Sequence, residues 1–113
     1  LLSRLVPIGI AKEILYTGKR ITSNEAKQWG LVNKVCSAEN LLDETLVLAE
    51  SIAKNAPLSL ISLKKAVNKG TETDLTTGIA LELEAYYKCA NSEDRVEGIR
   101  AFNEKRAPQW MGK

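Results

Sequence analysis

Apolar residues recur at helical spacing along most of this chain, between recognisable start and stop signals. In the first such run, apolar side chains follow Pro7 at intervals that keep them on one face as far as Gly18. Proline suits the first turn of a helix, where its missing N–H costs nothing, and glycine commonly ends a helix. The pattern therefore predicts a first helix over residues 7–17.

A shorter helix and one extended segment are expected next. Ser23 is a suitable N-cap for a helix over residues 24–29, and Gly30 can take the left-handed conformation that ends it. Residues 31–36 alternate poorly between polar and apolar side chains but are rich in β-branched ones. They predict at most one short strand.

Four further helices are predicted in the rest of the chain. Ser37 is expected to open the third and Pro57 the fourth, while Asp74 and Ser92 cap the fifth and sixth. Pro108 prevents the last helix from continuing. The third, fifth and sixth helices are amphipathic, whereas the fourth is apolar over more than half its circumference. Because a lone helical layer of this kind leaves an apolar patch exposed, we expect these helices to cover a partner surface.

Composition agrees with one mainly helical body. The chain has 113 residues, of which 44% are hydrophobic and only 5% aromatic, so aliphatic packing must dominate. Neither an internal repeat nor a long linker separates one part of the sequence from another. Residues 1–113 are therefore expected to form a single helical segment.

Charge and cysteine content exclude several classes of function. The net charge of +2 is too small to indicate a nucleic-acid or anionic-membrane partner, and no apolar run reaches the roughly 20 residues that span a bilayer. Cys36 and Cys89 lie too far apart for a C-x-x-C pair, and without histidine no Ser-His or Cys-His couple can form. Free reduced thiols are favoured over a disulfide, which fits a reducing compartment.

Two short signatures near the ends of the chain carry a family resemblance. The first is LYTGKRI at residues 15–21, leading to GLV at 30–32; the second is SEDRVEG at 92–98, leading to FNEKR at 102–106. In order and spacing they resemble the C-terminal part of the crotonase (enoyl-CoA hydratase/isomerase) family. The terminal pattern EGxxAFxEKRxPxFxGK of that family corresponds to EGIRAFNEKRAPQWMGK at residues 97–113.

This resemblance implies an α/β spiral parent whose helical C-terminal part, of about five to six helices, is the present chain. Residues 1–6 resemble the stretch just after the family's glycine-rich turn, so the chain is expected to be a fragment. The family's catalytic glutamates, and the backbone amides that hold the thioester oxygen, lie in N-terminal segments that residues 1–113 do not include. The implied parent reaction is reversible hydration of a 2-enoyl-CoA to a 3-hydroxyacyl-CoA, and the chain alone is expected to be inactive. Isomerisation, or another crotonase reaction, stays open, because relatives share this region.

The same resemblance implies partners and a location. The substrate would be an acyl-CoA thioester, and the parent would be a homo-oligomer, either a trimer or a dimer of trimers, with neither nucleic acid nor membrane as a partner. No metal or redox cofactor is expected. The parent would lie in the cytoplasm, or in the mitochondrial matrix of a eukaryote.

Three residues correspond to ligand contacts of the family. The lysine of its EKR motif reaches toward the phosphate-bearing nucleotide end of coenzyme A bound to a neighbouring subunit, and the phenylalanine three residues earlier lies near the adenine; by position these are Lys105 and Phe102. Tyr86 occupies the position of an aromatic side chain that closes the acyl pocket of an adjacent subunit. The alternatives are a solvated lysine at a helix end for Lys105 and simple packing for Tyr86.

Acidic residues of this chain are expected to be solvated or to cap helices rather than to be catalytic. Hydration of an enoyl thioester needs two carboxylates that flank one water. Glu82 and Glu84 lie on different faces of their helix, and Glu97 is expected to form a solvated pair with Arg100. Arg106 is a candidate for an ion pair at a subunit contact. The sequence therefore assigns no catalytic residue.

Two other functions compete with the family resemblance. Residues 23–32 imitate a helix-turn-helix, with Ala26 and Gly30 four positions apart. The following helix, however, carries acidic residues and no basic one before Lys54, so it would repel phosphates. A helical interaction module without a ligand fits the composition equally well.

Overall fold

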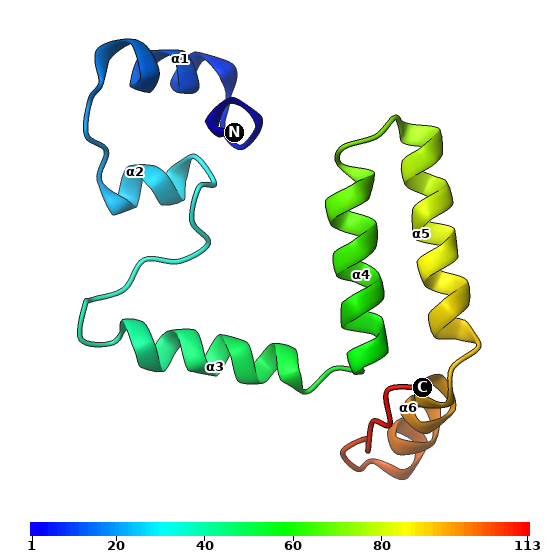
Figure 1. Cartoon of the computed structure of the whole chain (residues 1–113). Helices are drawn as coiled ribbons and strands as arrows, with labels where there is room; N and C mark the ends of the chain where they lie inside the picture. The colour runs from blue at the N-terminus through cyan, green and yellow to red at the C-terminus, as the bar shows by residue number, and fades with distance from the viewer. The chain divides into compact units, whose positions relative to one another are not determined.

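Every regular element of the protein is helical. The computed structural model describes all residues from 1 to 113 and contains no strand, so the mainly helical fold is confirmed and residues 31–36 are irregular. Six α-helices follow a 3-10 helix, η1 (Figure 1). The elements are η1 (Leu2–Arg4), α1 (Ile8–Thr17), α2 (Ser23–Gln28), α3 (Leu41–Ala53), α4 (Pro57–Gly70), α5 (Leu75–Ala90) and α6 (Glu93–Glu104). The chain divides into two compact units, residues 1–45 and 46–113, which are described separately below.

Local stop and start signals fix α1 and α2 in the first unit. Pro7 is the N-cap of α1, and Gly18 ends it at φ +62°, the left-handed conformation that glycine adopts without steric cost. The N-cap of α2 is Thr22 rather than Ser23, because Thr22 and Glu25 form a reciprocal capping box. Gly30 follows α2 at φ +78°, as predicted.

Helix α3 begins later than its sequence suggests. Ser37 was the predicted start, but residues 38–40 form a turn, and the helix begins at Leu41. Asp43 and Glu44 then lie in the first turn, where carboxylates complement the positive end of the helix dipole, and Glu44 pairs with Lys34. Residues 29–40 therefore separate α2 from α3, whereas a helix-turn-helix needs a turn of about three to four residues. The helix-turn-helix interpretation of residues 23–32 is thus wrong.

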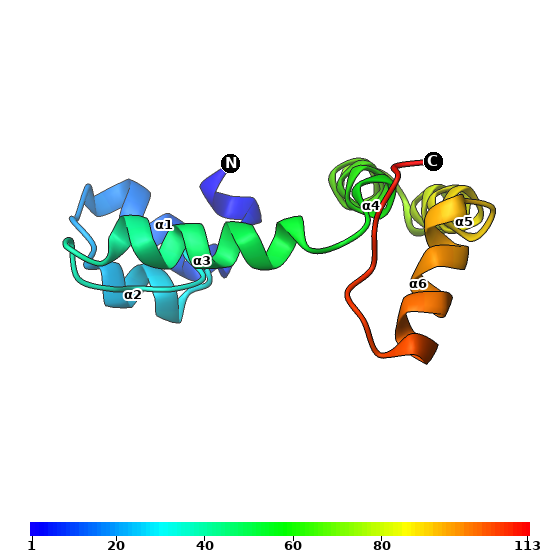
Figure 2. The ribbon, with the colours of Figure 1, turned by 90° about the horizontal axis from the view of Figure 1, so that it is seen from below.

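In the second unit, α4 and α5 form an antiparallel hairpin in which the two helices lie side by side (Figures 1 and 2). Pro57 opens α4 and Asp74 caps α5, both as predicted. A Cβ added at Gly78 would lie 3.5 Å from the carbonyl oxygen of Gly70, so small residues bring the two helices together near the turn. Farther along the hairpin, Lys65 pairs with Glu84 at 2.7 Å.

Ser92 starts α6 by the mechanism that its sequence indicates. Its Oγ accepts a hydrogen bond from the backbone N–H of Arg95 at 3.1 Å and donates one to the carbonyl of Cys89 at 2.7 Å. The hydroxyl therefore links the end of α5 to the start of α6.

Replacing Ser92 by alanine is expected to lower the free energy of unfolding by about 1 kcal/mol, because the first turn of α6 loses its cap. Chemical denaturation of the whole protein measures this change. Ser92→Thr keeps the capping oxygen and serves as the control, and an equal loss in both variants would contradict a capping role.

Few apolar side chains are buried within the chain. Only Val6, Ala11 and Ala101 form its buried apolar core. Most large apolar side chains of α3, α4, α5 and α6 are exposed, including Leu46, Ile61, Leu83 and Ile99. An apolar surface of this extent is typical of helices that cover another part of a protein. No single helix is long and apolar enough to cross a membrane, and only α3 and α4 taken together, across residues 54–56, reach the length and hydropathy of a span.

Candidate functional site

A shallow groove follows the junction of α5 and α6 in the second unit. Its volume is about 390 Å³. Residues of α4, α5, α6 and the C-terminal tail (residues 105–113) line it, among them Ser59, Tyr86, Cys89, Ile99 and Trp110. The groove contains one residue predicted to contact a ligand, namely Tyr86.

Tyr86 lies on α5 with its ring largely available to other molecules. Its side chain is 64% exposed, and its ring meets that of Tyr87 edge to face at 5.6 Å between centroids. Core packing within this chain, which was the alternative role, therefore does not bury Tyr86. Its ring can take part in a contact outside the 113 residues.

The end of α6 presents the other two predicted residues. Phe102 is 84% exposed, the largest exposure of any aromatic side chain in the chain, and Lys105 is exposed three positions later. The backbone N–H of Lys105 donates to the carbonyl of Phe102 at 3.2 Å, so the two residues are neighbours at the end of α6. Neither of them lines the groove that contains Tyr86.

Lys105 has an unusual backbone conformation for a residue with a side chain. It caps α6 at φ +53° and ψ +40°, and it is the only residue other than glycine with a positive φ. This left-handed conformation is uncommon for residues with a Cβ and is retained where the surroundings enforce it. Two backbone hydrogen bonds close the helix here, from Lys105 to the carbonyl of Phe102 and from Arg106 to that of Ala101.

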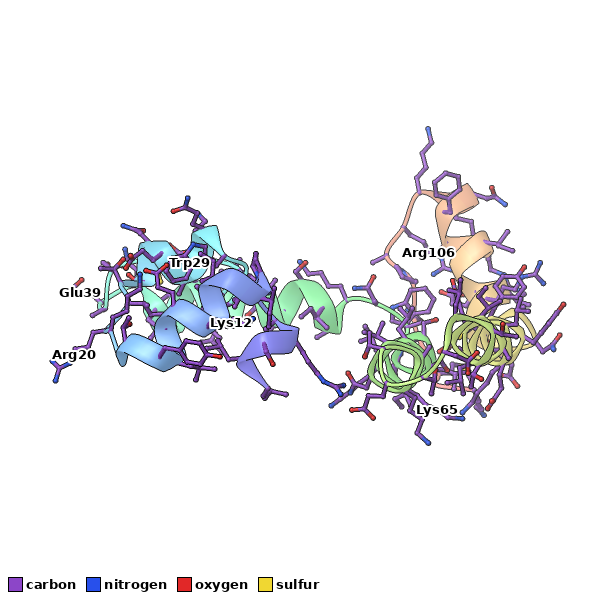
Figure 3. All side chains as sticks on the ribbon, turned by 90° about the horizontal axis from the view of Figure 1, so that it is seen from above. Lys12, Arg20, Trp29, Glu39, Lys65 and Arg106 are labelled. Carbon is purple, nitrogen blue, oxygen red and sulfur yellow. The ribbon has the colours of Figure 1, made fainter.

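An ion-pair network surrounds that helix end. The guanidinium of Arg106 donates to both carboxylate oxygens of Glu97, at 2.6 and 3.0 Å, and its Nε donates to Glu104 at 2.6 Å. Figure 3 shows Arg106 beside α6. The predicted partner of Glu97, Arg100, is thus not its hydrogen-bonded partner, and Arg106 pairs with two carboxylates of its own chain. A pair of Arg106 at a subunit contact stays a prediction.

This network changes the acidity of Glu97. Hydrogen bonds from Arg106 and from the backbone N–H of Gln109 stabilise the carboxylate and lower the pKa of Glu97 from 4.5 to about 2. Because the pKa is lowered in the folded state, the stability that this pair contributes is present above pH 4.5 and is lost only as the pH falls toward 2. Glu97 is therefore ionised at neutral pH and can hold Arg106 and the backbone N–H of Gln109.

Asp94 holds the C-terminal tail, a role that the sequence did not indicate. Its side chain is 3% exposed and accepts hydrogen bonds from the backbone N–H groups of Met111, at 2.6 Å, and Gly112, at 3.0 Å. Its own N–H donates to the carbonyl of Lys113 at 3.1 Å. The sequence places Asp94 in the first turn of a helix but gives no sign that a segment 17 residues away binds to it.

Trp110 joins the tail to two other parts of the second unit. Its indole N–H donates to the carbonyl of Lys54 at 2.7 Å, and a Cβ added at Gly98 would lie 3.3 Å from its ring. Gly98 thus leaves room for the indole against α6. The tail turns back from the end of α6 toward the start of α4 (Figure 2).

Neither a metal-binding cluster nor a disulfide occurs in the structure. Cys36 and Cys89 are both free, and no group of three or more acidic, cysteine or histidine side chains could hold a metal ion. Three carboxylates bind groups of the protein itself: Asp94 binds the C-terminal tail, Glu97 binds Arg106 and Glu84 binds Lys65. Each of these three carboxylates therefore has a hydrogen-bonded partner within the chain.

Comparison with known proteins places this arrangement in a family. The family model described as enoyl-CoA hydratase/isomerase matches residues 1–113. The crystal structure of an enoyl-CoA hydratase from Bacillus anthracis superposes with a TM-score of 0.95 at 42% identity, over 99% of this chain and 43% of that one. A short-chain-enoyl-CoA hydratase of Clostridium acetobutylicum is 40% identical over 93% of this chain and 40% of its own length.

Relatives with a differently named reaction match equally well. A carnitinyl-CoA dehydratase of Proteus mirabilis is 39% identical over 99% of this chain and 44% of its own length. The chain thus spans about two fifths of the length of the relatives that it matches. With a family model that covers every residue and a helical arrangement shared with solved members, the chain belongs to the enoyl-CoA hydratase/isomerase family.

Proposed function

We propose that this chain serves as the helical, substrate-contacting and oligomerising C-terminal part of an enoyl-CoA hydratase. The observation that carries the proposal is the end of α6, where an exposed aromatic ring and an exposed ammonium, those of Phe102 and Lys105, lie together. That pair suits a ligand with both a flat base and phosphate groups, such as the nucleotide end of coenzyme A. Relatives whose names include a CoA thioester support the same choice.

Each of the two side chains suits one part of the nucleotide. A lysine ammonium binds phosphate as a compact point charge, and hydrogen bonds between two ionised groups are stronger than neutral ones. An exposed phenylalanine ring offers an apolar face to an adenine. Lys105 forms none of the ion pairs of the chain, so its ammonium needs no rearrangement to meet a phosphate.

Tyr86 has a separate role in this proposal. Its exposed ring on α5 would close the acyl pocket of an adjacent subunit, and its hydroxyl would add polarity at the acyl end. A pocket closed by tyrosine should favour shorter acyl chains than one closed by phenylalanine.

The extent of exposed apolar surface supports an oligomer. Burying apolar side chains stabilises an assembly by about 25 cal/mol per Å² removed from water, and helices α3 to α6 expose many of them. We propose contacts with other copies of the same protein, as a trimer or a dimer of trimers. A helical interaction module without a ligand would use the same surfaces and is the second candidate function.

The proposed reaction is the reversible addition of water to a 2-enoyl-CoA, giving a 3-hydroxyacyl-CoA. It involves no net oxidation or reduction, so we propose no redox cofactor for it. Two carboxylates can supply its proton transfers, so we propose no metal either. The acid, the base and the oxyanion donors would come from residues outside this chain. Double-bond isomerisation, or dehydration as in the carnitinyl-CoA relative, is the alternative chemistry.

Replacing Lys105 by alanine in the whole protein is expected to weaken acyl-CoA binding about tenfold, which is the worth of one hydrogen bond between charged groups. The melting temperature should stay nearly unchanged, because Lys105 is exposed and unpaired. Calorimetric titration with acetyl-CoA, a thioester without a double bond to hydrate, measures the affinity.

Lys12→Ala is the matched control, since Lys12 is an exposed lysine on α1 in the other unit. Both variants lose one positive charge, so a general electrostatic effect on an anionic ligand would weaken binding equally. A large fall in melting temperature for Lys105→Ala with unchanged affinity would make Lys105 structural and would contradict the proposal.

A further inference from the structure

We propose that Glu97 is a positioning residue: through its ion pair with Arg106 it holds Lys105 in the left-handed conformation that presents the lysine to the nucleotide end of coenzyme A. This inference rests on the proposed function of Lys105 and adds to it a residue that never touches the ligand. It gives Glu97 a role in ligand affinity, which neither the sequence analysis nor the proposed function assigned to it.

The geometry fixes the chain immediately after Lys105. Arg106 is the next residue, and both of its terminal guanidinium nitrogens donate to Glu97, at 2.6 and 3.0 Å. The backbone N–H of Gln109 donates to the same carboxylate at 2.8 Å. Glu97 therefore holds the segment after Lys105 at two points, whereas the body of α6 fixes the segment before it.

Lys105 needs such support because its conformation is unfavourable for a residue with a Cβ. At φ +53° its Cβ carries a steric cost that glycine would not have, and its side chain is exposed rather than buried. The backbone hydrogen bonds of Lys105 and Arg106 hold this turn in part, and the ion pair adds a restraint from a side chain. Without the pair, we expect the turn to adopt an ordinary negative φ more often. The lysine side chain would then leave the helix end in a different direction.

The charges of the network are paired with one another rather than with Lys105. Glu97 and Glu104 both lie within hydrogen-bond distance of Arg106, so their negative charges face a guanidinium rather than the Lys105 ammonium. The bidentate geometry of arginine matters here, because lysine cannot reproduce two parallel hydrogen bonds.

The test compares two ligands that differ only at the end that Lys105 contacts. Acetyl-CoA carries the nucleotide, and acetyl-pantetheine lacks it. In the whole protein, Glu97→Gln is expected to raise the Kd for acetyl-CoA about fivefold, less than the loss of the lysine itself, while the Kd for acetyl-pantetheine stays unchanged. Arg106→Lys, which keeps the charge but loses the two-point contact, should have the same selective effect.

Glu84→Gln is the matched control, because Glu84 forms a comparable ion pair with Lys65 on the α4–α5 hairpin. It should change neither affinity. Equal weakening of both ligands by Glu97→Gln would reveal a general structural role for Glu97 and would overturn the inference.

A double variant separates this inference from the proposed function of Lys105. If Glu97 acts through Lys105, then Glu97→Gln has no further effect on acetyl-CoA affinity once Lys105 is alanine, so the two changes are not additive. If Lys105→Ala fails to change the ratio of the two Kd values, the proposed function of Lys105 is wrong. If Lys105→Ala changes that ratio but Glu97→Gln does not, only the positioning inference is wrong.

Discussion

Replacing Asp94 by alanine is expected to lower the free energy of unfolding by about 3 kcal/mol, because the N–H groups of Met111 and Gly112 lose their charged acceptor. The carboxylate is 3% exposed and lies in the first turn of α6, where it also complements the helix dipole. Water cannot replace a buried acceptor without local rearrangement. The C-terminal tail should therefore detach from α6.

Chemical denaturation of the whole protein measures the loss, and limited proteolysis near residue 110 reports detachment of the tail. Glu93→Ala is the matched control, since Glu93 is the neighbouring acidic residue of the same helix turn and is exposed. Asp94→Asn keeps one acceptor oxygen and should lose less than the alanine variant. Equal stability of Asp94→Ala and Glu93→Ala would show that Asp94 does not hold the tail.

Features of this fold that depend on near neighbours in sequence could be predicted. Gly18, Asp74 and Ser92 end or start helices by interactions within four residues, and the structure places them as expected. The predicted start of α3 at Ser37 was wrong, because a turn follows Ser37 before the helix begins at Leu41. In that turn the N–H of Asn40 donates to the carbonyl of Ser37. A capping residue alone does not show which of two successive turns continues as a helix.

Contacts between distant residues explain what the sequence could not show. Asp94 meets residues 17 and 18 positions later, and the indole of Trp110 meets a carbonyl 56 positions earlier. Helical periodicity and capping rules relate residues only a few positions apart, so they cannot predict these contacts. The sequence assigned Glu97 to Arg100 by the usual spacing of helix pairs, whereas Arg106 reaches it because the chain reverses direction at Lys105.

The proposed ligand-contact residues could be predicted from family motifs but not from the physical pattern of the sequence. Periodicity alone would leave Lys105 as a solvated helix-end lysine and Tyr86 as a packing residue. The structure adds that both are exposed, and that Lys105 has a constrained backbone. Exposure and constraint together are typical of a residue held for contact with another molecule.

The 113-residue chain, purified alone, is expected not to hydrate crotonyl-CoA above the uncatalysed rate. Enzymes commonly accelerate reactions by about 10⁶-fold or more, through groups placed around the reacting atoms. Hydration needs two carboxylates around one water and fixed N–H donors for the enolate oxygen. Here Asp94, Glu97 and Glu84 are each held by a different partner, so no such pair forms among them.

The loss of crotonyl-CoA absorbance at saturating substrate measures this activity. Protein from a host that lacks its own enoyl-CoA hydratases removes the main contaminant, and the whole protein provides the positive control. Because the exposed faces of α3 to α6 would lack their covering partner, the isolated chain should also bind a hydrophobic dye more strongly than the whole protein does. Turnover by the isolated chain that Glu84→Gln or Glu97→Gln abolishes would place catalytic carboxylates within these residues and would overturn the assignment of the acid and base to segments outside them.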